Sequence, residues 1–206
     1  MLLIEVGSFN GSDSLKFYEK GYKVFTFEPK KDLCDALSAK TSHLPNYTVV
    51  NKAVSLVDGE IDFYICVEGG ASSILPFKSD DELNKHWTEA RPDIHYSGTS
   101  YKVKSTRLDT FIEENGLTNE SIDYLHVDAQ GADLDVLKSV GKYISNVKGG
   151  VVETCYSVEK AIYTEQKDDL VAVVEWLMAR GFSIEKVESN DVTNCECNVY
   201  FKRVGI

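Results

Sequence analysis

Short apolar runs alternate with amphipathic segments along most of this chain. The apolar runs lie at 2–6, 23–27, 47–50, 122–128 and 150–153, and their length and continuity predict buried strands. Apolar residues at helical spacing predict helices over 32–40, 107–115, 130–141 and 166–180. Strands that alternate with helices in this way are typical of an α/β fold built on a parallel sheet.

The end of the chain departs from this alternation. Two further strands are predicted at 182–187 and 198–204, joined by the turn-rich connection Ser189-Asn190-Asp191, which is too short for a parallel crossover. They must therefore run in opposite directions. We expect a single domain over 1–206: a Rossmann-like, seven-stranded, mostly parallel sheet with a reversed last strand and helices on both faces.

The first predicted strand ends in a glycine turn. Gly7 and Gly11 follow the apolar run, and Ser12-Asp13-Ser14 is a helix start. Glycine permits a sharp turn and a close ligand, and the helix start offers unpaired N–H groups. Two such glycines can also make an ordinary strand-to-helix turn. However, Glu28 follows the second strand about twenty residues later, where an acid can accept both hydroxyls of a ribose, so a nucleotide-binding unit is predicted.

The regular pattern breaks down between 68 and 106. Just before it, Asp58-Gly59 predicts a hairpin turn and 60–67 an added strand. Long irregular segments in compact domains are usually lids or substrate-binding loops, and the aromatic content here, Trp87 included, argues against a disordered insertion. We therefore expect a lid over the site. Its candidate substrate residues are Ser72, Ser73, His95 and Tyr96.

Composition narrows the possible partners. The formal net charge of -11 argues against nucleic acid as a substrate, because such sites need a basic surface. No apolar run is long enough to cross a bilayer and the sequence has no basic and apolar leader, so we expect a cytoplasmic protein. The five cysteines are odd in number and spread out, which favours reduced thiols in the core.

An ordered set of segments resembles the FkbM-type methyltransferase family. They are the turn Glu5-Val6-Gly7-Ser8-Phe9-Asn10-Gly11, the pair Glu28-Pro29, the lid segment Ser72-Ser73-Ile74, and the motifs Leu108-Asp109-Thr110-Phe111 and Asp128-Ala129-Gln130-Gly131-Ala132-Asp133. No single segment is specific, but their order and spacing cover nearly the whole chain. The resemblance implies a class I methyltransferase that transfers a methyl group from S-adenosylmethionine (SAM) to a hydroxyl of a sugar or glycan-like acceptor.

The resemblance also implies a set of cofactor-binding residues. These are Glu5, Gly7, Ser8, Asn10, Gly11, Glu28, Pro29, Lys52, Ala53 and Asp128. Glu28 is expected to hold the ribose, and Asn51 to Val54, at the end of the third strand, to flank the adenine. Three positions depart from the family pattern: Glu5 replaces Asp, Phe9 replaces Asn, and Gln130 replaces Glu, so that a role of that Glu as base or metal ligand cannot be carried over. The chain begins at the first strand, which would fit a domain of a larger polypeptide.

The predicted chemistry depends on Asp128 and Glu153. Both follow buried runs that we expect to be neighbouring strands, and parallel strands of an open sheet bind ligands at their carboxyl ends. Together they could position and deprotonate the acceptor hydroxyl, or bind Mg²⁺ or Mn²⁺ that does so. The plainer alternative is that Asp128 only orients the cofactor and Glu153 only caps a helix or pairs with a lysine. His126 is predicted to be a core residue, whereas His86 and His95 are alternative bases.

Two other functions remain open at this point. An NAD-dependent oxidoreductase would use Glu28 in the same way, but the first turn lacks Gly-x-Gly-x-x-Gly and the last strand is reversed. A non-catalytic cofactor-binding domain would use 68–106 to contact a partner. Titration with the cofactor separates the second possibility from an enzyme.

Overall fold

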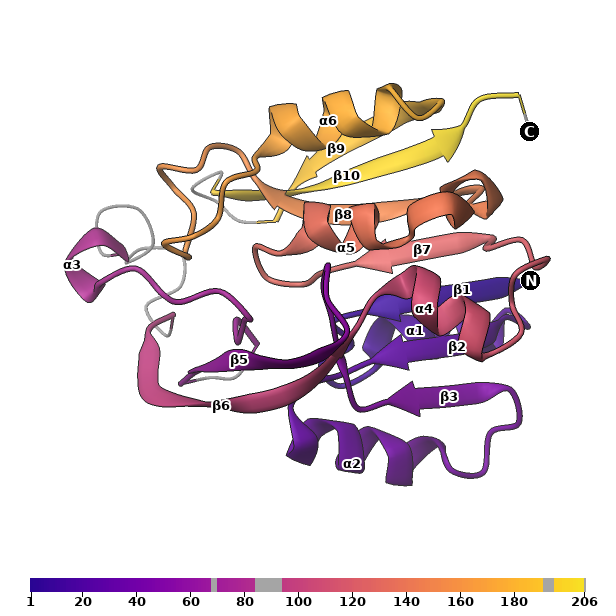
Figure 1. Cartoon of the computed structure of the whole chain (residues 1–206), viewed down its shortest axis with the longest axis horizontal. Helices are drawn as coiled ribbons and strands as arrows, with labels where there is room; N and C mark the ends of the chain where they lie inside the picture. Colours follow the sequence, from indigo (N-terminus) through magenta and orange to yellow (C-terminus); the bar gives the residue numbers. More distant parts are fainter. Residues whose placement is uncertain (68–69, 84–93, 191–194, 206) are drawn as a thin grey trace.

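A seven-stranded sheet forms the centre of the protein in a computed structural model that describes residues 1–67, 70–83, 94–190 and 195–205 (Figure 1). The strand order is β3-β2-β1-β7-β8-β10-β9. The strands are β1 (Leu2–Val6), β2 (Lys23–Phe27), β3 (Tyr47–Val50), β7 (Tyr124–Val127), β8 (Gly149–Cys155), β9 (Phe182–Ser189) and β10 (Glu196–Arg203). All pairs from β3 to β8 are parallel, whereas β10 is antiparallel to both β8 and β9. The predicted mostly parallel sheet with a reversed last strand is confirmed.

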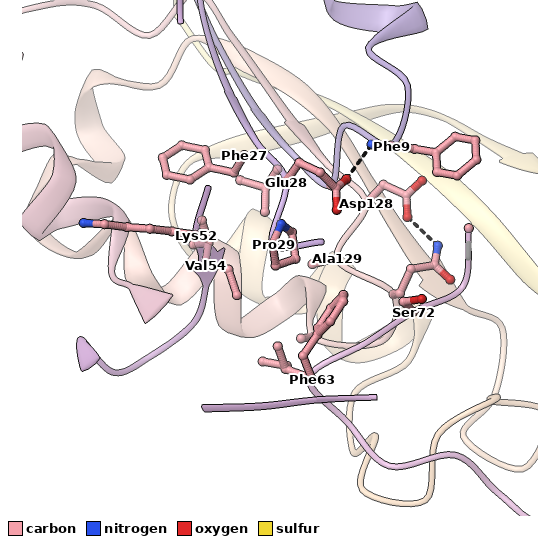
Figure 2. Close-up of a pocket in the computed structure, with 17 residues that line it drawn as sticks. Phe9, Phe27, Glu28, Pro29, Lys52, Val54, Phe63, Ser72, Asp128 and Ala129 are labelled. Carbon is pink, nitrogen blue, oxygen red and sulfur yellow. Dashed lines mark hydrogen bonds between the residues drawn. The ribbon is translucent and has the colours of Figure 1, made fainter. Parts of the chain in front are cut away.

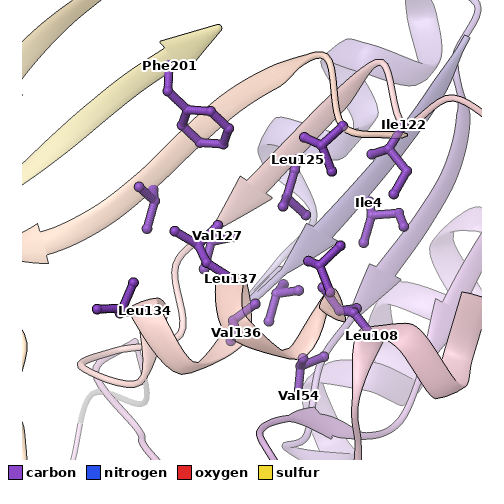
Figure 3. Packing of buried hydrophobic residues seen from close by; sticks show 14 of the residues in the cluster. Ile4, Val54, Leu108, Ile122, Leu125, Val127, Leu134, Val136, Leu137 and Phe201 are labelled. Atoms are coloured by element: carbon purple, nitrogen blue, oxygen red, sulfur yellow. The ribbon is translucent and has the colours of Figure 1, made fainter. Parts of the chain in front are cut away.

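Helices cover both faces of this sheet. They are α1 (Ser12–Glu19), α2 (Lys31–Thr41), α4 (Leu108–Glu114), α5 (Asp133–Ser139) and α6 (Leu170–Met178), with a short 3₁₀ turn, η1 (Gly141–Asn146), after α5. Because side chains alternate along a strand, Ile4 joins the core under α4, α5 and α6, while Leu3 packs on the opposite face with residues of α1. Figure 3 shows the larger core, in which Val136 and Leu137 of α5 meet Leu125 and Val127 of β7.

A second, three-stranded sheet lies beside the carboxyl ends of β1, β2 and β7. It contains β4 (Ala53–Val54), β5 (Gly59–Cys66) and β6 (Tyr96–Thr106) in the order β4-β6-β5. The predicted hairpin at Asp58-Gly59 is therefore wrong, because β6 lies between β4 and β5 and pairs with both. The carboxylate of Asp58 instead accepts hydrogen bonds from the backbone N–H of Arg107 and the hydroxyl of Thr110.

The segment predicted to be irregular, 68–106, contains regular structure. Its last part is β6, an eleven-residue strand, and a short helix, α3 (Asp80–Leu83), precedes it. Most of β6 from Tyr96 to Lys102 is exposed, so its sequence lacks the apolar alternation of a half-buried strand. Within the described part of the chain, no helix is both long enough and apolar enough to span a membrane.

Candidate functional site

A pocket opens where β1, β2 and β7 end and the second sheet begins (Figure 2). It encloses about 610 Å³ of empty space, solvent at its mouth included, which is within the usual range for a small-molecule site. Lys52 and Val54 lie at one end and Phe9 and Asp128 at the other. The lining residues are Val6, Gly7, Phe9, Phe27, Glu28, Pro29, Lys52, Ala53, Val54, Phe63, Gly70, Ser72, Ile74, Asp128, Ala129, Gln130 and Ala132.

The glycine turn brings β1 and β7 together below the pocket. Gly7 has φ of 84°, and a Cβ there would lie 1.7 Å from the backbone oxygen of Asp128. Only glycine therefore allows this approach. Gly11 also has a positive φ, and its missing Cβ makes room for Leu37 of α2. Gly7 lines the pocket, whereas Gly11 does not and instead sets where α1 begins.

Glu28 lies at the end of β2 with its carboxylate held by the loops around it. Its Oε2 accepts the backbone N–H of Phe9 at 2.8 Å, and its Oε1 accepts that of Lys30 at 2.9 Å. Each carboxylate oxygen has a further lone pair, which leaves capacity for two ribose hydroxyls. Burial raises the pKa of Glu28 to about 7, against the lowering effect of the two N–H donors. Its charge is therefore sensitive to whatever fills the pocket.

Glu5 does not line the pocket, although it was predicted to bind the cofactor. Its buried carboxylate accepts the hydroxyl of Thr26 on β2 at 2.5 Å and the backbone N–H of Ser14 in α1 at 3.1 Å. The side chain is thus used to join β1, β2 and the helix start. His126, predicted to be a core residue, has Nδ1 3.5 Å from Glu5, which raises its pKa although burial acts to lower it. This cluster lies outside the pocket lining.

Of the other residues predicted to bind the cofactor, some line the pocket and some do not. Pro29, Lys52 and Ala53 line the pocket. Ser8 and Asn10 do not: the backbone N–H of Ser8 bonds to the oxygen of Phe27, and the side chain of Asn10 accepts the N–H of Ser12. These two residues shape the turn itself.

Two residues near Glu28, Asn51 and Phe63, help to shape this part of the site. The amide of Asn51 donates to the backbone oxygens of Glu28 and Pro29, at 2.8 and 3.1 Å, and so fixes the end of β2. Phe63 on β5 lines the pocket below Pro29 and Ala129 in Figure 2. Asn51 was expected to flank the adenine with the residues that follow it, but it does not line the pocket and its side chain binds the end of β2 instead. Phe63 was missed, because its position depends on how the second sheet folds back.

Asp128 and Glu153 are close together, but an amide lies between them. Asp128 follows β7 and lines the pocket, whereas Glu153 lies within β8 and does not. The Nε2 of Gln130 donates to Oδ1 of Asp128 at 2.5 Å and to Oε2 of Glu153 at 2.8 Å. The predicted end of the strand at Glu153 is wrong, because antiparallel pairing with β10 extends β8 to Cys155.

This arrangement does not support the predicted Mg²⁺ or Mn²⁺ site. The donor that bridges the two carboxylates is the amide of Gln130, and the remaining oxygen of Glu153 accepts the side chain of Asn190. Among the described residues, no group of three or more His, Cys, Asp or Glu side chains is placed to hold a metal ion. Burial, followed by the charge of Asp128, raises the pKa of Glu153 well above its usual value.

The paired serines of the predicted lid have different positions. Ser72 lines the pocket and its hydroxyl accepts the backbone N–H of Cys66. Ser73 is buried and donates its hydroxyl to the backbone oxygen of Gln130 at 2.6 Å. His95 and Tyr96 do not line the pocket, and Tyr96 instead stacks on Phe77. The other predicted lid residues, His86 and Trp87, lie outside the described residues.

Comparison with known proteins agrees with this fold and identifies the family. The methyltransferase FkbM domain matches residues 5–184. The 2-O-methyltransferase NoeI of Sinorhizobium fredii is 27% identical over 138 residues, which are 66% of this chain and 56% of that protein. The chain therefore spans little more than half the length of this relative.

Solved methyltransferases share the overall fold. SMU.1697c of Streptococcus mutans, in complex with S-adenosylhomocysteine (SAH), matches with a TM-score of 0.52 and 12% identity over 98% of this chain and 88% of its own. The magnesium protoporphyrin IX methyltransferase ChlM of Synechocystis PCC 6803, with bound SAM, matches with a TM-score of 0.51 and 10% identity over 98% of this chain and 70% of its own.

The fold has the parallel sheet with a reversed strand, and the family match extends from the glycine turn into β9. An oxidoreductase of the NAD-dependent class is accordingly set aside. The chain belongs to the FkbM methyltransferase family.

Proposed function

We propose that this chain transfers a methyl group from SAM to a hydroxyl of a sugar or glycan-like acceptor. The observation that carries the proposal is the pocket at the strand ends, which is lined by the two acids Glu28 and Asp128, in a chain of the FkbM family. The relationship to a 2-O-methyltransferase supports a hydroxyl as the acceptor group.

The pocket residues fit SAM. Glu28 is placed to accept the ribose hydroxyls with the lone pairs that Phe9 and Lys30 leave free. Ala53, Val54 and Phe63 form an apolar wall that suits an adenine ring. When bound, the cofactor supplies an electrophilic methyl group on a sulfonium centre, and the acidic residues of the pocket complement its positive charge.

Asp128 is the residue proposed to act on the acceptor. It is at the end of the pocket farther from Lys52, and Gln130 holds its Oδ1 in a fixed direction. A carboxylate so held can accept the proton of an acceptor hydroxyl and align its oxygen, which for a positioned base is worth about 10²-fold to 10⁴-fold in rate. Glu153 has a supporting part in this proposal, since it does not line the pocket and shares the Nε2 of Gln130 with Asp128.

Calorimetric titration with SAH and NAD tests the cofactor part of the proposal. SAH is expected to bind at one site, because the glycine turn, Glu28 and the apolar wall are all in place. NAD is expected to show no heat of binding. Tight binding of NAD, or no binding of SAH to folded protein, would overturn the proposed function.

Asp128→Asn tests the chemical part, with Asp62→Asn as the matched control, because Asp62 is exposed on β5 and pairs only with Lys102 among the described residues. The Asp128 variant should lose about 10²-fold or more in methyl transfer to a panel of methyl glycosides while its SAH affinity changes much less. Equal activity of the two variants would remove Asp128 from the chemistry.

A further inference from the structure

Tyr163 is a buried tyrosine that sequence reasoning did not single out. It lies in the connection between β8 and α6, where the segment 161–164 runs along 76–78. Its hydroxyl is 2.7 Å from the backbone oxygen of Ala71 and 3.0 Å from Oε1 of Gln130. The phenol therefore contacts both the segment 70–75 and the loop after β7.

The loop after β7 is shaped around this ring. Gln130 has φ of 53° and Gly131 has φ of 88°, both in the left-handed region. A Cβ on Gly131 would lie 2.4 Å from Cδ2 of Tyr163, so the ring occupies the space that glycine leaves. A left-handed residue other than glycine is strained, and Gln130 is kept there by bonds from both its backbone and its side chain.

Gln130 joins four partners on different elements. Its backbone oxygen accepts Ser73, its Oε1 faces the phenol of Tyr163, and its Nε2 donates to Asp128 and Glu153. This orientation of the amide places a donor toward each carboxylate and an acceptor toward the hydroxyl. The direction of Asp128 thus depends on Gln130, and that of Gln130 depends on Tyr163.

We propose that Tyr163 is a positioning residue which, through the side chain of Gln130, couples the packing of the segment 70–75 over the pocket to the orientation of the Asp128 carboxylate. Both ends of this chain of contacts border the pocket, because Ser72 and Ile74 of the segment 70–75 line it and so does Asp128. If the segment 70–75 moves away, the hydroxyl of Tyr163 loses the backbone oxygen of Ala71, and the backbone oxygen of Gln130 loses the hydroxyl of Ser73. Both of these contacts orient Gln130.

The phenol suits this role because it has one proton and two acceptors. Displacement of either acceptor shifts the hydrogen bond toward the other, so the two contacts are linked. Burial raises the pKa of Tyr163 well above its usual value, so the proton stays in place at any pH at which the protein works. The inference rests on the proposed function for its consequence, but the coupling itself can be measured in the free protein.

Hydrogen exchange of peptides covering 70–76 tests the coupling, in the full chain with and without SAH. Tyr163→Phe removes only the hydroxyl. Tyr156→Phe is the matched control, because Tyr156 is half-buried directly after β8 and its side chain makes no hydrogen bond to another described residue. Gln130→Glu keeps the size and an acceptor for Tyr163 but removes the donor to Asp128 and Glu153. Asp128→Ala removes the far end of the chain of contacts.

In the free protein, Tyr163→Phe should exchange about tenfold faster at 70–76 than Tyr156→Phe, and Asp128→Ala and Gln130→Glu should each exchange faster than wild type. With SAH bound, wild type should gain protection there that Tyr163→Phe does not gain, while the two proteins bind SAH within about threefold of each other. A merely structural role of the ring would lower the unfolding temperature without removing the response to SAH.

Two results would overturn the inference. One is equal exchange of Tyr163→Phe and Tyr156→Phe, and another is unchanged exchange at 70–76 in both Asp128→Ala and Gln130→Glu. If Tyr163→Phe does not fold, the exchange of Asp128→Ala and Gln130→Glu at 70–76 decides whether the coupling exists. If wild type fails to bind SAH, the proposed function falls, whereas the exchange of the free variants still decides whether Tyr163 and Asp128 are coupled.

Discussion

The affinity for SAH should depend on pH through Glu28. Burial places the pKa of its carboxyl at about 7 in the free protein, well above the ordinary 4.5. A carboxylate accepts two ribose hydroxyls better than a carboxylic acid, because hydrogen bonds to a charged group are stronger. Binding should therefore require the ionised form and release a proton at pH values below 7.

The size of the effect follows from the ionised fraction. With a pKa of about 7, about one tenth of the Glu28 side chains are ionised at pH 6 and about nine tenths at pH 8. If only the ionised form binds, the Kd should be about tenfold lower at pH 8 than at pH 6. Glu28→Gln should weaken binding at pH 8 by about tenfold to a hundredfold, equivalent to about 1.5–3 kcal/mol for hydrogen bonds to a charged group.

Calorimetry with SAH at several pH values measures this directly. Glu28→Gln supplies the background from titration of the ligand and of other groups, and its Kd should be nearly independent of pH between 6 and 8. Glu19→Gln, an exposed acid on α1, should behave as wild type. A wild-type Kd that does not change with pH, or equal affinities of wild type and Glu28→Gln at pH 8, would refute the assignment of Glu28 to the ribose.

Three further predictions concern the framework of the site. Gly7→Ala should unfold the protein or abolish SAH binding, whereas Gly21→Ala, with nearly the same positive φ but open space around it, should cost only about 1 kcal/mol in chemical denaturation. Because folding raises the pKa of Glu28 and Asp133 to about 7, both acids favour the folded state at low pH and lose that contribution as pH rises through 7. The unfolding temperature should thus fall by about 5 °C or more between pH 5.5 and 8, and by less in Asp133→Asn; an unchanged or rising value would contradict the burial of these groups. Methyl transfer should persist in excess chelator, since the amide of Gln130 already bridges Asp128 and Glu153; loss of activity on chelation, restored by Mg²⁺, would contradict this.

The main sheet and the two acids in the pocket, Glu28 and Asp128, could be predicted because short stretches of sequence specify them. The strands 23–27 and 47–50 were predicted with the bounds that the structure has, since each is a short apolar run between turn residues. Glu28 and Asp128 directly follow such strands, and parallel strands of one sheet carry their carboxyl ends to the same edge. Strand direction alone therefore brought these two residues to the pocket.

The contacts that orient the site could not be predicted in this way. Tyr163 reaches Ala71 across 92 positions of sequence and Gln130 across 33, and no local pattern specifies such pairs. Glu5 has the same sequence context as Glu28, an acid at the end of an apolar run. Its side chain, however, points to the face of the sheet under α1, where Thr26 and Ser14 bind it. The strand β6 was missed because most of its residues are exposed.

Methyl transfer itself tests the central claim most directly. The protein would be incubated with SAM labelled with ¹³C at the methyl group and a panel of methyl glycosides, and the products analysed by NMR and mass spectrometry. The account predicts a labelled methyl ether on a sugar hydroxyl, formed by wild type and by Asp62→Asn but not by Asp128→Asn. Transfer of the label to nitrogen or carbon acceptors only, or a labelled ether formed equally by Asp128→Asn, would contradict it.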